Sequence, residues 1–244
     1  MAALQRAVWV LLAGLAVMGA TPPASAPAVA PAVVPPVVPV AGKLGAPVQL
    51  FNGKDLTGWK WYGPIATTKL EDVWTVKNGI LHCAALPANA TGYMDMDKEF
   101  KNFVLTVEYR HITTGNGGTF VCIHGTEKVF PNAIQIQGKF GNVGDLINQN
   151  TGMTKMTTDP ARTKPSGTDV FVSRLTPAAG KQAEMPMGQW NTLVITMEKG
   201  NLAVTNNGVL LNTASEIAPD SGKIGFQAEG AEMEFRKVEL TPIE

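Results

Sequence analysis

Short runs of β-branched and aromatic residues with alternating apolar and polar positions dominate the chain from Val48 onward. The clearest runs are residues 73–77, 80–84, 103–111, 118–124, 133–137, 190–198, 202–206, 223–229 and 233–240. Turn dipeptides such as Asn207-Gly208 separate neighbouring runs, which is a hairpin signal. No window of a dozen residues keeps the 3.6-residue apolar period of a helix. The pattern therefore predicts an all-β fold of two packed antiparallel sheets, with the polar, Thr-rich stretch 148–167 as a long loop.

The beginning of the chain has a different composition. Residues 1–26 show the pattern of a secretory signal peptide, with Arg6 before the apolar run Ala7–Ala20 and the small residues Ala24-Ser25-Ala26 after it. Residues 27–47 are rich in Pro, Ala and Val, which favours an extended polyproline II spacer. We expect a signal peptide (1–26), a spacer (27–47) and a β-sandwich domain (48–244), with export to the periplasm, the cell surface or the medium. An uncleaved membrane anchor is the alternative for the first segment.

Charge and cysteine content exclude several classes of function. The 20 basic and 20 acidic side chains give a formal net charge of zero, whereas a nucleic-acid-binding domain carries a basic excess. After signal removal we expect at most peripheral membrane contact. Cys83 and Cys122 lie in strand-like apolar sequence, and we expect two buried free thiols, with a disulfide as the alternative that export permits. Neither cysteine belongs to a Cys/His cluster with zinc-ligand spacing.

Alternation also assigns the faces of individual strands. In residues 103–110 the apolar positions share one face, and Glu108 and Arg110 share the other. In residues 134–137 two Ile residues oppose Gln135 and Gln137, and in residues 224–229 the polar face carries Gln227 and Glu229. We expect these three polar faces to form one concave surface. The alternative is an ordinary solvated sheet face.

An ordered set of sequence landmarks resembles one protein family. The landmarks are residues 50–59 (LFNGKDLTGW), Trp74, Asn78-Gly79-Ile80-Leu81, residues 103–110 (FVLTVEYR), Asn116-Gly117-Gly118, Ile134-Gln135-Ile136, Gly144-Asp145-Leu146, Trp190-Asn191, Asn207-Gly208, residues 222–227 (GKIGFQ) and residues 234–238 (EFRKV). Together they resemble the 3-keto-disaccharide hydrolase domain family over about residues 48–241. The resemblance implies a concanavalin-like jelly roll, similar also to laminin-G domains, in an exported bacterial protein. It implies a carbohydrate substrate, a disaccharide oxidised to a ketone at C3.

This chain departs from the family pattern at two positions. Members commonly carry a Glu just before the Val/Ile-Gln-Ile segment and an Asp just after it, where this chain has Ala133 and Gln137. Three functions therefore stay open. The first is an enzyme that removes the C2 proton of a 3-keto-glycoside, expels the C1 substituent and adds water, without an oxocarbenium route. The others are a non-catalytic carbohydrate-binding module of the same fold and a cell-surface adhesion domain.

The resemblance and the strand faces together nominate site residues. For catalysis we nominate Glu108 as base or metal ligand, Arg110 as stabiliser of the enolate, His124 as proton shuttle or metal ligand, and Glu229 as a second carboxylate. For sugar binding we nominate Gln135, Gln137, Asp145, Gln227 and Trp61, since exposed aromatic rings stack on sugars. For each of these residues a structural role is the alternative.

The remaining candidates concern cofactors and core packing. We assign no cofactor, with a divalent metal as the alternative. Asp95, Asp97 and Glu99 alternate on one strand, and we expect an exposed acidic edge there, with calcium as the alternative. Trp74 and Trp190 are expected in the core. Oligomeric state is left open.

Overall fold

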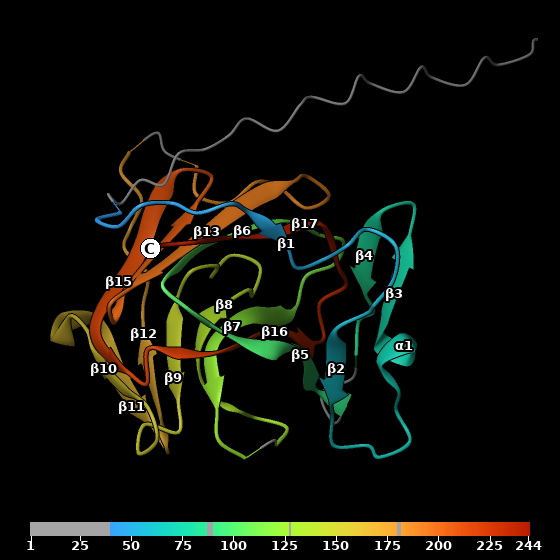
Figure 1. The fold of residues 1–244 in the computed structure, drawn as a ribbon, viewed down its shortest axis with the longest axis horizontal. Helices are drawn as coiled ribbons and strands as arrows, with labels where there is room; N and C mark the ends of the chain where they lie inside the picture. Colours follow the sequence, from blue (N-terminus) through green and yellow to red (C-terminus); the bar gives the residue numbers. More distant parts are fainter. Residues whose placement is uncertain (1–39, 87–89, 127, 180–181) are drawn as a thin grey trace, which may run out of the picture. The chain divides into compact units, whose positions relative to one another are not determined.

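The computed structural model describes residues 40–86, 90–126, 128–179 and 182–244 (Figure 1). The expected signal peptide and most of the expected spacer, residues 1–39, lie outside the described residues. The described part is almost entirely β-structure, as the alternating runs predict. Its one α-helix is a single turn, α1 (Leu70–Val73), and a 3-10 turn, η2, covers Pro160–Arg162. Among the described residues, no helix has the length and apolar content needed to cross a membrane.

The strands form two antiparallel sheets. The nine-stranded sheet contains, in order, β10 (Lys155–Thr157), β15 (Val209–Ala218), β14 (Asn201–Asn206), β13 (Asn191–Glu198), β6 (Phe103–His111), β17 (Met233–Pro242), β4 (Ile80–Cys83) and β3 (Trp74–Lys77), with β1 (Val48–Gln49) paired to β17. The eight-stranded sheet contains, in order, β11 (Thr163–Ser166), β12 (Asp169–Val172), β9 (Leu146–Gln149), β8 (Asn132–Gln137), β7 (Asn116–His124), β16 (Ser221–Glu229), β5 (Gly92–Lys101) and β2 (Trp59–Tyr62). This is the predicted two-sheet sandwich, and the stretch 148–167 is not one loop, because it contains β10, η2 and β11.

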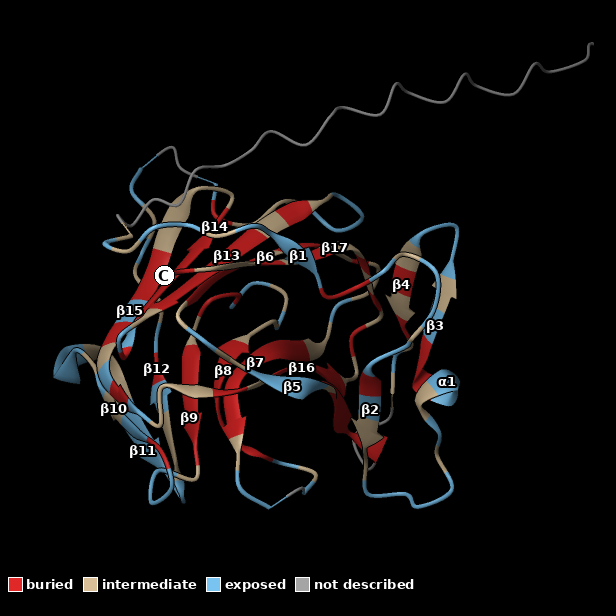
Figure 2. Cartoon of the chain, viewed as in Figure 1, coloured by how far each residue is buried: buried red, intermediate tan, exposed pale blue. Residues whose placement is uncertain are grey.

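The core lies between the two sheets and contains the apolar face of each predicted strand. Phe103, Leu105, Val107 and Tyr109 of β6 face it from one sheet, and Ile134, Ile136, Ile224 and Phe226 face it from the other. Trp74 is fully buried, as predicted, and packs against Phe226 and Phe235. Figure 2 shows how thoroughly β7, β8 and β16 are buried, whereas β11 at the edge of its sheet is exposed. Cys83 and Cys122 are both buried free thiols, as expected.

Candidate functional site

The eight-stranded sheet has an outer face, opposite the core, on which several predicted site residues meet. Gln135 and Gln137 lie there on β8, and Gln227 and Glu229 lie there on β16. The strand between them, β7, brings Gly118 opposite both Gln137 and Gln227, so a glycine separates the two polar strands. Two of the three polar strand faces inferred from alternation therefore share one surface.

A chain of amide hydrogen bonds crosses this face. Gln149 of β9 donates its Nε2 to Gln135 Oε1 at 2.8 Å, and Gln135 donates its Nε2 to Gln227 Oε1 at 2.7 Å. Gln227 in turn donates to the carboxylate of Glu229. The three glutamines are buried, with exposed fractions of 5%, 1% and 4% in chain order 149, 135, 227. Because every amide donates in the same direction, the positive ends of the dipoles all point toward Glu229. We call these four residues the amide chain.

The absence of a side chain at Gly118 makes the amide chain possible. A Cβ at this position would lie 2.6 Å from Gln135 Nε2 and 3.0 Å from Gln135 Cγ. The Gln135 side chain therefore crosses directly over the Gly118 backbone to reach Gln227. A residue with any side chain at position 118 would force Gln135 to move.

Glu229 is the accessible end of the amide chain. Asn116 donates its Nδ2 to Glu229 Oε2 at 2.7 Å, so the carboxylate has two neutral donors. Burial raises the pKa of Glu229 above its ordinary value of 4.5, although the hydrogen bonds from Asn116 and Gln227 and the charge of Lys139 each act to lower it. A half-buried carboxyl with a raised pKa and a fixed orientation is suited to proton transfer.

Aromatic side chains adjoin the amide chain on the same face, a feature that the sequence analysis missed. Tyr93 of β5 lies opposite Gln227 and stacks on Tyr62 of β2, with ring centroids 4.9 Å apart. Tyr62 also lines a hollow of about 330 Å³, whose other lining residues are Trp61, Gly63, Ile65, Ala66, Thr68, Lys128 and Val129. In β2, Trp59 and Trp61 point toward the core, so strand alternation places Tyr62 on the outer face. This alternation is the sequence signal that could have identified Tyr62.

A buried ion pair lies beside these rings. Asp95 of β5 is 1% exposed and its Oδ2 lies 3.6 Å from Lys223 Nζ, which also stands 6.0 Å from the Tyr62 ring centre. Asp97 pairs with Lys60 at 2.9 Å. The predicted exposed acidic edge is therefore wrong for Asp95, because β5 lies between β16 and β2 in the sheet and Asp95 faces Lys223 of β16. The carboxylates of Asp95 and Asp97 each form an ion pair with a lysine. Within residues 40–244, the short gaps excepted, no group of three His, Cys, Asp or Glu is placed to hold a metal.

Glu108 and Arg110 do not join this surface, so the prediction of one shared polar face is wrong for them. Their strand, β6, belongs to the nine-stranded sheet, and their side chains point to its outer face. There Glu108 accepts from Arg236 Nε at 2.5 Å, and Arg110 pairs with Glu234. The physical reason is strand pairing: β6 pairs with β13 and β17, and both belong to the other sheet from β7 and β8.

Trp190 completes this second cluster, and its predicted core position is wrong. The half-buried indole lies between the guanidinium groups of Arg110 and Arg236, whose central carbons stand 4.7 and 4.5 Å from the ring centre. Cation–π contacts of this kind stabilise a structure by roughly 0.5–2 kcal/mol each. Arg236 is therefore structural, as its alternation with buried Phe235 indicates.

The other nominated residues lie apart from the amide chain. Both ring nitrogens of His124 face backbone carbonyls, those of Cys122 at 2.8 Å and Met153 at 3.0 Å, so this ring anchors a loop. Asp145 Oδ1 accepts from the Arg174 backbone N–H at 2.7 Å. Trp61 lies on the opposite face of β2 from Tyr62 and packs against the core cluster, but it also lines the hollow beside Tyr62. Ala133, where the family pattern has Glu, is buried in a small cluster with Tyr93, Phe120 and Ile123.

Solved structures with the same fold include several carbohydrate-related proteins. A putative glycosyl hydrolase from Parabacteroides distasonis aligns with a TM-score of 0.55 at 18% identity, covering 81% of this chain and 94% of its own. The non-specific endo-beta-1,3(4)-glucanase SCLam aligns with a TM-score of 0.50 at 14% identity, covering 85% and 93%. A protein of unknown function with a galectin-like fold from Bacillus subtilis aligns with a TM-score of 0.50 at 11% identity, covering 83% and 98%. At these identities the likeness establishes the jelly-roll fold alone.

Sequence comparison places the chain in a family. No curated protein sequence matches it. The model of one domain family, however, matches residues 46–241, which is nearly the whole described part and agrees with the resemblance drawn from residues 48–241. The chain belongs to the 3-keto-alpha-glucoside-1,2-lyase-like domain family.

Proposed function

We propose that this protein cleaves a 3-keto-glycoside on the outer face of the eight-stranded sheet, with Glu229 as the base. The observation that carries the proposal is the amide chain, because it fixes one accessible carboxylate in a defined orientation on the face that also presents Tyr62 and Gln137. Gln227, Tyr93 and Tyr62 follow one another across three neighbouring strands, a span of about 10 Å. Glu229 lies about 7 Å further along β16. This span suits two linked sugar rings.

The reaction proceeds by elimination. The ketone at C3 acidifies the C2 hydrogen, and the Glu229 carboxylate takes this proton while the C2–H electron pair forms an enolate. The enolate then expels the C1 oxygen substituent, which takes the proton from the Glu229 carboxyl as it leaves, and a 1,2-unsaturated 3-keto sugar remains. Addition of water across the double bond completes a net hydrolysis. The enolate oxygen needs a hydrogen-bond donor, and Gln137 uses its Oε1 on Gly138 and Gln135, which leaves its Nε2 for this task.

The hollow beside Tyr62 supplies the second part of the site. Its volume of about 330 Å³ lies at the lower end of the range for small-ligand pockets. The Tyr62 ring offers a stacking surface for the apolar side of a sugar, and Lys128 offers a donor to its hydroxyl groups. We assign the leaving sugar to this hollow and the oxidised sugar to Glu229.

The test uses p-nitrophenyl 3-keto-α-glucoside, with the unoxidised glucoside as the matched substrate. We expect nitrophenol release from the keto substrate alone, since only a ketone acidifies C2. Glu229→Gln should lower turnover by about 10²–10⁴-fold, the usual contribution of a positioned base. Glu234→Gln, a carboxylate change on the opposite sheet, is the control and should leave turnover unchanged. Equal cleavage of both substrates, or full activity of the Glu229 variant, would contradict the proposal.

A carbohydrate-binding module is the second candidate, favoured by one observation. The two positions where family members commonly carry a carboxylate hold Ala133 and Gln137 in this chain. Glu229 is therefore the one carboxylate of the amide chain. A module predicts saturable binding of the keto substrate, measured by calorimetry, with no nitrophenol release in any variant. Export by the segment 1–26 is likewise a proposal, tested by N-terminal sequencing of protein recovered outside the cytoplasm.

A further inference from the structure

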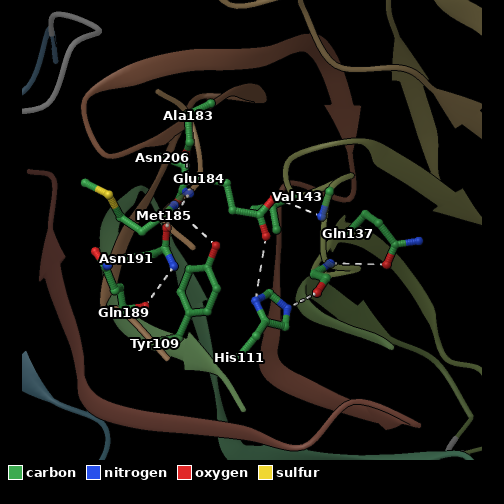
Figure 3. Close-up of polar contacts among 12 residues, drawn as sticks. Tyr109, His111, Gln137, Val143, Ala183, Glu184, Met185, Gln189, Asn191 and Asn206 are labelled. Atoms are coloured by element: carbon green, nitrogen blue, oxygen red, sulfur yellow. Dashed lines mark hydrogen bonds and ion pairs between the residues drawn. The ribbon is translucent and has the colours of Figure 1, made fainter. Parts of the chain in front are cut away.

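A histidine and a glutamate meet inside the protein, away from the amide chain. His111 ends β6 and is 1% exposed, and the Glu184 side chain is 10% exposed in the connection between β12 and β13. Figure 3 shows the imidazole between the Glu184 carboxylate on one side and a backbone carbonyl on the other. The Tyr109 and Phe140 rings meet the imidazole edge-on, with centroids 5.5 and 5.4 Å away, and help to exclude water.

The hydrogen bonds of this pair define where its protons are. His111 Nε2 lies 2.8 Å from the Gly138 carbonyl oxygen, and because a carbonyl can only accept, Nε2 carries the hydrogen. In the neutral ring Nδ1 is then an acceptor. Nδ1 faces Glu184 Oε1 at 3.7 Å, and both atoms are buried without a hydrogen-bond partner. The other carboxylate oxygen, Oε2, accepts from the Gly141 N–H at 3.0 Å. Two acceptors therefore face each other across a gap that one proton would bridge.

The charged and titratable groups around the pair leave this gap unfilled. Arg174 donates to the carbonyls of Val143 and Gly141, and its charge lowers the pKa of Glu184. Asp145 accepts from the Arg174 backbone, and the Tyr109 hydroxyl turns to Asn206. Burial is nevertheless the largest influence on both members: it raises the pKa of Glu184 and lowers that of His111. Burial therefore disfavours the charged form of both members, and one proton that enters the gap can bond Nδ1 to Oε1.

We propose that His111 and Glu184 take up one shared proton between Nδ1 and Oε1 as the pH falls, and that this proton links two connections of the fold. One connection, residues 138–141, is held by His111 through Gly138 and by Glu184 through Gly141. The other is residues 182–185, in which Ala183 O accepts from Asn206 and Met185 N donates to Asn191. Without the proton, the acceptor–acceptor contact opposes this closure. The device makes the junction sensitive to pH.

The variant Glu184→Gln tests the shared proton directly. A glutamine keeps the shape of the side chain, accepts from Gly141 with its oxygen and donates a permanent N–H to His111 Nδ1. At pH 8, where the wild-type pair lacks the proton, the variant should unfold about 3–8 °C higher, because two buried acceptors gain a donor. The difference in unfolding temperature between the variant and the wild type should decrease as the pH falls toward 5. The sign follows from linkage: the folded pair binds its proton above the pKa of 4.5 that an ordinary Glu has, so the wild type gains stability relative to the variant as pH decreases to that value.

A second His–Glu pair in the same protein is the control. His82 Nε2 lies 2.9 Å from Glu232 Oε1, and both side chains are about one-third exposed. Glu232→Gln should not raise the unfolding temperature at pH 8. The nitrogen chemical shift of His111 Nδ1 in the wild type should move from a bare acceptor to a hydrogen-bonded one over the same pH range. A stability gap independent of pH, a variant less stable at pH 8, or an unchanging Nδ1 shift would each overturn the proposal. None of these readouts depends on sugar turnover.

Discussion

Gly118→Ala tests whether the amide chain depends on the missing side chain. A Cβ at position 118 would lie 2.6, 3.0 and 3.1 Å from Nε2, Cγ and Cδ of Gln135, and real Cβ contacts are not shorter than 3.0 Å. The backbone of Gly118 is outside the left-handed region, so no conformational strain contributes. The three atoms nearest to the added methyl group all belong to Gln135, whose side chain must move away from Gln149 and Gln227.

The magnitude follows from the bonds that break. Two buried amide hydrogen bonds are lost and their partners stay buried, which costs about 2–4 kcal/mol. The alanine also restricts the unfolded chain, which offsets about 0.4–1 kcal/mol of this loss. We therefore expect the free energy of unfolding to fall by about 1–3.5 kcal/mol, and the unfolding temperature by about 2–14 °C for a domain of this size.

Urea unfolding followed by tryptophan fluorescence measures this change, with Gly117→Ala as the matched control. The nearest atom to a Cβ at Gly117 is the sulfur of Met233 at 3.0 Å, the end region of a flexible side chain on the core side. The control should cost less than about 1 kcal/mol. In a Gln135→Ala background, Gly118→Ala should add almost nothing, because the clashing side chain is gone. The reasoning would be refuted if Gly117→Ala and Gly118→Ala lowered the free energy of unfolding equally. It would also be refuted if the effects of Gly118→Ala and Gln135→Ala on this free energy were additive.

Three further outcomes follow from the structure. Glu108→Gln should reduce the free energy of unfolding by about 1–3 kcal/mol in urea titration, because Arg236 loses its carboxylate, and should leave keto-glycoside turnover unchanged. The pH–rate profile should fall on the acid side with a midpoint above 4.5, because burial raises the pKa of Glu229 and only its anion can accept the C2 proton; activity that persists to pH 4.5 would argue against this role. Cys83 and Cys122 should resist a colorimetric thiol reagent until the protein unfolds, because burial raises the pKa of Cys122 to about 12 and that of Cys83 further; a thiol titrated in the native state would contradict this.

The sequence correctly predicted those features that depend on residues of a single strand, such as which side chains share a face. The pleat puts residues i and i+2 on one face, so the alternation in 103–110 correctly separated Leu105 and Val107 from Glu108. It failed for Trp190, whose aromatic character indicated a core position. The indole instead lies between two arginines that strands β6 and β17 supply, and these strands pair only in the folded chain.

The candidate site could be predicted only in part for the same reason. The polar faces of Gln135 and Gln227 were readable, and these two residues do meet. Gln149 had no signal, because its stretch lacks a clear period and its role depends on β9 pairing with β8. His111 and Glu184 are distant in sequence and lie on no shared strand, so nothing local connects them.

The sequence by itself determined the β class, the inner and outer face of each long strand, and the family signature, because turn residues and two-residue periodicity are local properties of the chain. Only the tertiary structure decided that Glu229 ends the amide chain while Glu108 belongs to the opposite sheet. The reason is that the neighbours of a strand are chosen by long-range hydrogen-bond pairing and core packing, which act between residues that the linear order keeps far apart.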